Sequence, residues 1–199
     1  MNDKLDGILE RIKQLEKELP DEARKKQQDF RYTVQDRKVR FHEGVQAAHE
    51  RLVKKFTRYL YDSKPLTVLT TPMLLFCALP VVFIDLVAGV FQFVCFPVYG
   101  IPKVVRKDYV LMDRRKLAYL NWMEKWNCGY CEYVNGVLAY VQEVAGRTEQ
   151  YWCPIKHALR VKSTHSRYSH FFEYGDAEQY RKRLESVRRD FDDLTHKEG

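Results

Sequence analysis

Apolar residues recur along positions 1–19 with a spacing that is typical of a coiled coil. Successive apolar positions are three and four residues apart in alternation, and charged residues fill most positions between them. They are Leu5, Ile8, Ile12, Leu15 and Leu19. Pro20 is expected to end this segment. Because two heptads are too short to be stable alone, we expect the segment to pack on another helix, most simply one from a second copy of the chain.

Residues 20–64 continue with a looser helical pattern. Pro20 is followed by two acidic residues and an alanine, which is typical of the first turn of a helix. A helical stripe of apolar residues then extends to about Tyr61: Phe30, Val34, Phe41, Val45, Ala48, Leu52 and Phe56. We therefore expect one long amphipathic helix over residues 20–64.

Residues 66–99 are almost entirely apolar, with Asp85 as their single charged side chain. These 34 residues exceed the roughly 20 that one membrane crossing needs, but they are too few for two crossings and a turn. Basic residues flank both ends, so the positive-inside rule places both ends on the cytoplasmic side. We expect residues 65–102 to form a membrane-inserted helical hairpin that turns at Pro80, with a single tilted span as the alternative. Asp85 is expected to cap backbone N–H groups near the hairpin tip rather than to face a protein-lined polar site.

The position of the basic residues decides how the net charge of +7 is interpreted. Residues 1–64 carry 16 Lys and Arg against 12 Asp and Glu, and residues 103–116 carry six against two, while later charges balance. The excess therefore flanks the apolar segment, where anionic lipid head groups would meet it. We expect a bilayer with anionic head groups as the partner, and no nucleic acid. A polar stretch precedes the first long apolar run, so no signal peptide is expected and the N-terminus is expected to stay in the cytoplasm.

Four residues in region 103–199 have the spacing of metal ligands. Cys128 and Cys131 form a CxxC pair, and Cys153 and His157 form a second pair 22 residues after Cys131. Three cysteines and one histidine make the closed tetrahedral shell that structural zinc prefers. The sequence therefore predicts a Cys3His module that holds zinc, with iron or an iron-sulfur cluster as the alternative.

The second pair can return to the first only if the intervening helix breaks. Asn135-Gly136 is a strong turn or C-cap signal, and Gly146 is expected to end a short returning helix that begins at Val137. Two other interpretations of the cysteines stay open: a chance CxxC, and a redox dithiol. No βαβ pattern of the kind that carries such a dithiol is present. Glu149 is either a helix-capping residue or, if one coordination position is open, a proton acceptor.

Further helices are expected over Met112–Lys125 and from Asp176 through Phe191. We expect an all-α, membrane-associated protein with regions 1–19, 20–64, 65–102 and 103–199. No nucleotide, hydrolase or protease motif is present. The sequence favours a zinc-binding scaffold or assembly protein on the cytoplasmic face that forms a homo-oligomer or joins a membrane complex. The alternative is a membrane-bound iron-dependent redox enzyme that acts on a lipid-soluble substrate such as a quinone.

Overall fold

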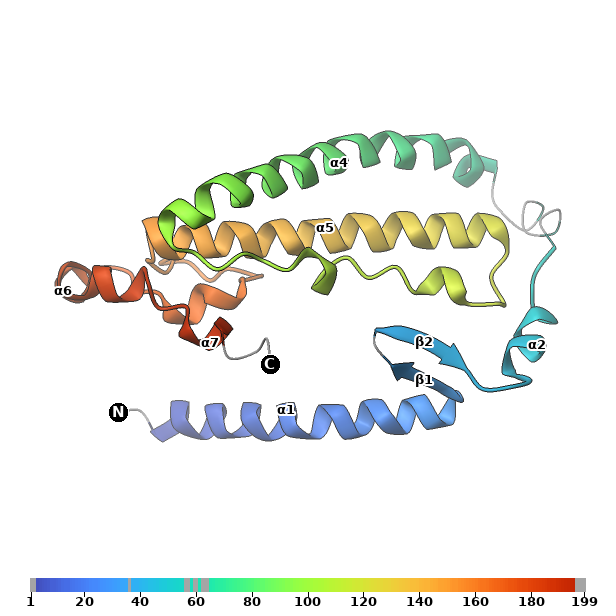
Figure 1. Cartoon of the computed structure of the whole chain (residues 1–199), viewed down its shortest axis with the longest axis horizontal. Helices are drawn as coiled ribbons and strands as arrows, with labels where there is room; N and C mark the ends of the chain where they lie inside the picture. The colour runs from blue at the N-terminus through green and yellow to red at the C-terminus, as the bar shows by residue number, and fades with distance from the viewer. Residues whose placement is uncertain (1–2, 36, 56–57, 59–60, 62–64, 196–199) are drawn as a thin grey trace. The chain divides into compact units, whose positions relative to one another are not determined.

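The computed structural model is mostly helical and describes residues 3–35, 37–55, 58, 61 and 65–195. Its helical content agrees with the expected class, apart from one pair of short strands (Figure 1). The elements in chain order are α1 (Asp3–Asp29), β1 (Tyr32–Gln35), β2 (Lys38–Phe41), α2 (Val45–Glu50), α4 (Pro65–Tyr99), the 3-10 helices η1 (Arg106–Asp108) and η2 (Arg114–Lys116), α5 (Trp122–Trp152), the 3-10 helix η3 (Ser166–His170), α6 (Ala177–Val187) and α7 (Asp192–Thr195).

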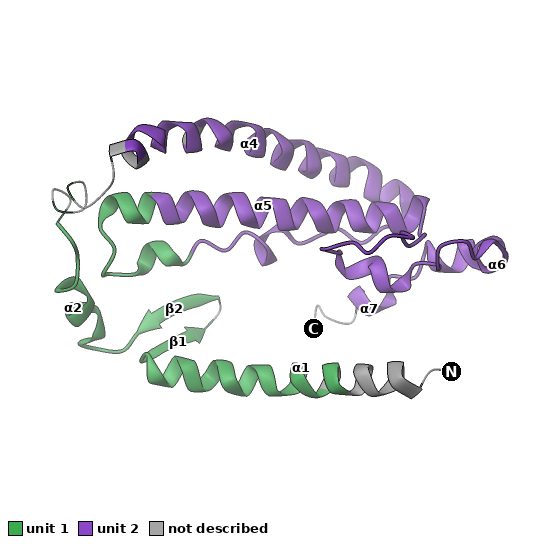
Figure 2. Ribbon diagram, turned by 180° about the vertical axis from the view of Figure 1, so that it is seen from behind, with its two compact units in different colours: residues 1–62, 113–126 green, residues 63–112, 127–199 purple. Residues whose placement is uncertain are grey.

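The chain divides into two compact units (Figure 2). Unit 1 comprises residues 1–62 and 113–126, and unit 2 comprises residues 63–112 and 127–199. Each unit therefore combines segments that are distant in the sequence.

Two predictions for residues of unit 1 are wrong. Helix α1 continues through Pro20, so the coiled-coil segment does not end there. An antiparallel hairpin replaces the expected long helix, with Tyr32 opposite Phe41 and their rings 6.0 Å apart. The residues of β2 alternate between exposed and half-buried, which is the period of a strand, and Arg31 and Arg37 adopt positive φ angles of 51° and 61° where the chain turns.

The start of α5 also differs from the prediction. A helix was expected from Met112, but residues 113–121 are mostly irregular around η2, and α5 begins at Trp122. The side chain of Asn121 accepts a hydrogen bond from the backbone N–H of Glu124 at 2.9 Å. The Glu124 carboxylate in turn accepts one from the backbone N–H of Asn121 at 2.8 Å. This reciprocal capping box fixes the first turn of α5.

In unit 2, α4 and α5 lie side by side, and residues 100–112 run back along them (Figures 1 and 2). Helix α4 is uninterrupted through Pro72, Pro80 and Pro97, so the predicted turn at Pro80 is wrong. Each proline removes one N–H donor, but no Gly, Asn, Asp or Ser stands beside Pro80 to support a turn. The core of this unit is formed by Ala88, Phe96, Ile101, Val104, Tyr140, Val144 and Phe191.

The C-terminal helix begins where it was predicted, but α6 ends at Val187 and does not continue through Phe191. The Asp176 carboxylate accepts a hydrogen bond from the Gln179 N–H at 3.1 Å and caps α6. Val187 and Phe191 are buried, at 7% and 4% exposure. The predicted apolar stripe of this segment therefore faces the core of unit 2.

Candidate functional site

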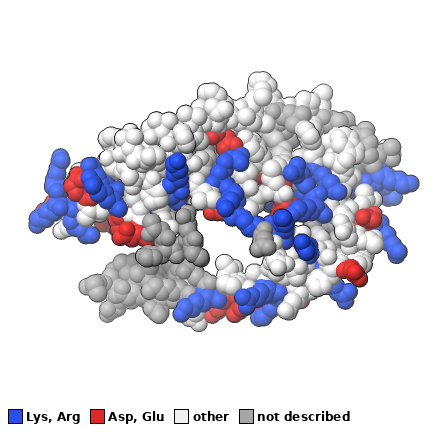
Figure 3. All heavy atoms as spheres, viewed as in Figure 1, with Lys and Arg blue, Asp and Glu red and all other residues white. Residues whose placement is uncertain are grey.

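Helix α4 has its strongly polar side chains Asp85 and Gln92 toward the protein, and most of its described large apolar side chains are exposed. Asp85 and Gln92 are seven residues apart, so both lie on one face of the helix, and both make hydrogen bonds to residues outside α4. On the face that Figure 3 shows, the described side chains along the outer edge of α4 are uncharged, and charged side chains lie below that edge. The apolar side chains of α4 that are more than half exposed are Leu66, Leu69, Met73, Phe76, Leu79, Phe83, Leu86, Val90, Phe93, Val94 and Val98.

Asp85 faces a polar site that is lined by protein. Arg106 donates two hydrogen bonds to its carboxylate, at 2.9 and 2.6 Å, and the hydroxyl of Tyr133 donates a third at 3.0 Å. Burial and the hydrogen bond to Asp85 raise the pKa of Tyr133, so its hydroxyl stays protonated and can donate. The predicted role of Asp85 as a cap at a hairpin tip is therefore wrong, since its partners lie in the segment after α4 and on α5.

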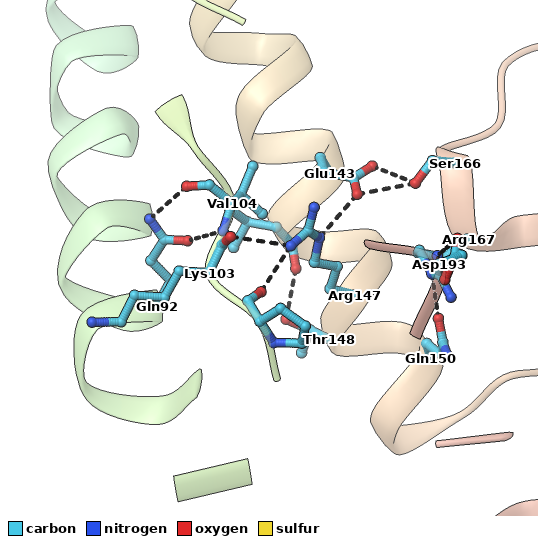
Figure 4. A network of polar contacts seen from close by, with 12 residues as sticks. Gln92, Lys103, Val104, Glu143, Arg147, Thr148, Gln150, Ser166, Arg167 and Asp193 are labelled. Carbon is cyan, nitrogen blue, oxygen red and sulfur yellow. Dashed lines mark hydrogen bonds and ion pairs between the residues drawn. The ribbon is translucent and has the colours of Figure 1, made fainter. Parts of the chain in front are cut away.

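Gln92 holds the extended segment that follows α4. Its side-chain oxygen accepts from the Val104 N–H at 2.9 Å, and its amide donates to the Val104 carbonyl at 3.3 Å (Figure 4). The same amide donates to the Tyr140 hydroxyl at 2.7 Å. The side chain therefore pairs with both main-chain groups of Val104, as a neighbouring strand would. Buried backbone groups require such partners.

Arg147 of α5 satisfies the main chain of the same segment (Figure 4). Its guanidinium donates to the Pro102 and Lys103 carbonyls, at 2.8 and 3.2 Å, and to the Glu143 carboxylate at 3.0 Å. The hydroxyl of Ser166 donates to the same carboxylate at 2.8 Å. The Arg147 and Glu143 side chains are only 9% and 6% exposed, so the ion pair and its hydrogen bonds are largely removed from water.

An open apolar groove of about 550 Å³ lies between α4 and α5. Its lining comprises Ile84, Val87, Ala88, Phe91, Val141, Val144, Ala145, Thr148, Glu149 and Trp152. Glu149 supplies the one charged group of this lining, and its carboxylate lies 3.0 Å from Nε2 of His165. The imidazole packs so closely on α5 that a Cβ added at Gly146 would collide with it. Glu149, the weak catalytic candidate of the sequence, is thus one half of a carboxylate–imidazole pair at an apolar groove.

The predicted metal ligands are not brought together. Helix α5 is continuous through Asn135-Gly136, so the expected break there is wrong. Cys131 and Trp152 are consequently about 32 Å apart along the helix axis, and Cys153 and His157 follow Trp152. Within the described ranges, no group of three His, Cys, Asp or Glu side chains is placed to hold a metal ion. The zinc or iron site at Cys128, Cys131, Cys153 and His157 stays a prediction.

The residues around the expected break explain why α5 continues. The side-chain amide of Asn135 donates to the Cys131 carbonyl at 2.9 Å, within the helix. A Cβ at Gly136 would lie 2.8 Å from the Tyr109 carbonyl oxygen and from the Val110 Cα. Gly136 therefore permits close approach of residues 109–110 to α5 and does not end the helix.

No protein-family model, curated protein or solved structure matches this chain. The functional argument therefore depends on the residues themselves. By length and composition, residues Leu69–Tyr99 of α4 could cross a membrane.

Proposed function

We propose that α4 anchors this chain in a membrane, with its outer face in hydrocarbon and its polar face against α5, and that the anchored protein serves as a scaffold for assembly. One observation carries the proposal: Asp85 and Gln92 point inward while eleven large apolar side chains of the same helix are more than half exposed. A water-soluble protein orients its surface helices the other way round. Within lipid, polar side chains face protein partners.

The size of the exposed apolar face supports lipid as its environment. Removing one Val, Leu, Phe or Met side chain from water contributes about 1.5–3 kcal/mol, and soluble monomers rarely expose contiguous apolar patches larger than a few hundred Å². Helix α4 spans 35 residues, or about 52 Å, which exceeds the roughly 30 Å of bilayer hydrocarbon.

The seam of α1 supports the assembly role. Ile12, Leu15 and Leu19 are 47%, 58% and 69% exposed, so the apolar positions of the heptad pattern are available to another helix. The side chains of Leu5 and Ile8 lie outside the described residues. We propose that this seam joins copies of the chain.

A pair of lysines in the outer face of α4 tests the anchoring role. Each lysine at the centre of a membrane helix costs about 2.5–3.5 kcal/mol, so Leu86→Lys/Val90→Lys is expected to lower the fraction of protein that floats with neutral vesicles. The control, Leu159→Lys/Val161→Lys, adds the same charge at exposed apolar positions outside α4. It is expected to float like the wild type. Equal flotation of both variants would contradict the proposal.

A second candidate function is binding of a lipid-soluble molecule, such as a quinone, in the groove between α4 and α5. The observation that favours it is the Glu149–His165 pair, which can donate to or accept from a ligand carbonyl or hydroxyl at the edge of an apolar surface. In detergent, a short-chain benzoquinone is expected to quench Trp152 fluorescence. Filling the groove with Ala145→Phe should reduce the quenching, while Ala158→Phe, at an exposed position outside the groove, should not. Identical quenching of both variants would exclude this groove as the binding site.

A further inference from the structure

Unit 1 gathers four cations around one hollow of about 570 Å³. Arg40 comes from β2, Arg115 and Lys116 from η2, and Lys125 from the first turn of α5. The other lining residues are Val39, Phe41 and Gln46, so the lining holds four positive groups and no acid. In the part of the chain that the structure describes, none of these four side chains takes part in an ion pair or hydrogen bond.

The backbone fixes the segments that carry the cations. The N–H of Lys116 donates to the Asp113 carbonyl at 3.0 Å, and the N–H of Lys125 donates to the Asn121 carbonyl at 2.9 Å. Arg40 lies opposite Thr33 in the hairpin. Like charges that are held near one another repel, and a bound anion removes that repulsion. The arrangement therefore fits an anionic ligand with several oxygen acceptors.

A second hollow, of about 460 Å³, adjoins the first and indicates which anion fits. Lys116 and Lys125 line both hollows, and the second adds Lys54 and Lys55, with Glu50 as its acid. Its lining also includes Val53 and Trp122, which are 36% and 60% exposed. Basic side chains beside an exposed Trp are typical of chain at the level of lipid head groups, where the ring contacts acyl chains and the cations contact phosphate.

We infer that Arg40, Arg115, Lys116 and Lys125 bind the phosphate of an anionic phospholipid head group. The choice of a lipid as the source of the phosphate rests on the proposed membrane anchoring by α4, while the cluster itself does not. Figure 3 shows Lys and Arg side chains gathered on the face in view.

The test compares short-chain phosphatidylglycerol, short-chain phosphatidylcholine, inorganic phosphate and a short oligonucleotide as ligands for the full chain in neutral detergent. Binding is followed by tryptophan fluorescence at physiological ionic strength. Phosphatidylglycerol is expected to bind most tightly. Since each basic residue near a lipid surface contributes about 1 kcal/mol, Arg115→Gln/Lys125→Gln should weaken this binding about 30-fold. The control Arg160→Gln/Lys162→Gln removes two exposed cations elsewhere and should change it less than about twofold.

Three results would overturn the inference: unchanged phosphatidylglycerol binding by the Arg115→Gln/Lys125→Gln variant, inorganic phosphate binding as tight as that of the lipid, or tighter binding of a short oligonucleotide. Circular dichroism of both double variants checks that they are folded. The vesicle-flotation test of α4 uses neutral lipid and different residues. Head-group binding that does not depend on Arg115 and Lys125, together with the expected flotation results, would therefore contradict only the head-group site. Unchanged flotation of the α4 variant, together with the expected head-group binding, would contradict only the α4 anchor.

Discussion

The buried ion pair between Arg147 and Glu143 is expected to stabilise unit 2 strongly. Replacing Arg147 by Met keeps most of the side-chain volume but leaves the Pro102 and Lys103 carbonyls without their donor, and the Glu143 carboxylate without its counter-charge. Breaking a buried pair by removing one partner costs about 3–5 kcal/mol. For a chain of this length, that corresponds to a fall in Tm of about 6–20 °C.

The assay is thermal unfolding of the detergent-solubilised chain, followed by circular dichroism. Lys182→Met is the matched control, because Lys182 also pairs with a carboxylate four residues away, on Glu178, but with both side chains exposed at 65% and 74%. Such a pair contributes about 0.3–0.5 kcal/mol. The double variant Glu143→Gln/Arg147→Met leaves no unpaired buried charge. Its fall in Tm should therefore be smaller than the sum of the falls in the two single variants. If Arg147→Met lowered the Tm no more than Lys182→Met, the ion pair with Glu143 and the hydrogen bonds to the Pro102 and Lys103 carbonyls would not stabilise unit 2 as expected.

Three further outcomes are expected. Gly136→Ala should lower the Tm, because the new Cβ would lie 2.8 Å from backbone atoms of residues 109 and 110. Gly89→Ala, where nothing lies within 4 Å of the new Cβ, should leave the Tm unchanged or raise it. A rise in Tm in both variants would contradict the close approach at Gly136. Burial alone would raise the pKa of Asp193, but two hydrogen bonds from Arg167 outweigh it and hold that pKa below its usual value. The resulting stabilisation is present above the unfolded-state pKa and is lost as the pH falls through the lower folded-state pKa. Asp193→Asn should therefore flatten the decline in Tm below about pH 4. A decline that is the same in the variant would exclude the Arg167–Asp193 pair as its source. If Cys153 shares one metal with the CxxC pair, Cys153→Ser should remove a stoichiometric zinc or iron, as measured by elemental analysis; an unchanged metal content would exclude the four-residue site and agree with the separation of these residues by α5.

Local signals predicted the elements that depend on neighbours in the sequence. Asp176 and the apolar stripe after it predicted α6. The run from Leu66 predicted an apolar helical segment, although the favoured form was a hairpin and only the alternative was one long helix. Asn121 and Glu124 form a capping box that marks the start of α5 in the sequence itself, so the expected start at Met112 could have been corrected by this signal.

Other elements depend on contacts between distant residues and could not be read from spacing. Val34 and Phe41 fit a helical stripe, but each also lies two residues from another apolar residue, Tyr32 and Val39, as in a strand. The pairing of the two strands shows that this segment is a hairpin. Gly136 has the appearance of a helix end, but its function is to let residues 109–110 approach.

The candidate site was only partly visible in the sequence. Asp85 and Glu149 were identified, but their partners Arg106 and His165 are 21 and 16 residues away, and no local pattern links them. Gln92 carried a usable signal, because it repeats the polar character of Asp85 seven residues later, on the same helix face.

The inward pairing of Asp85 and Gln92 has a consequence for how the anchor can move. A uniformly apolar helix could separate sideways from its neighbours within a bilayer at little cost, because lipid tails are as apolar as its own side chains. If α4 separated from α5 and from residues 100–112, an aspartate and a carboxamide would meet hydrocarbon without partners, which is costly at the bilayer centre. If α4 anchors the chain in a bilayer as proposed, the two polar side chains therefore resist its lateral separation from its neighbours, and its entry into the bilayer is coupled to its docking on the rest of unit 2.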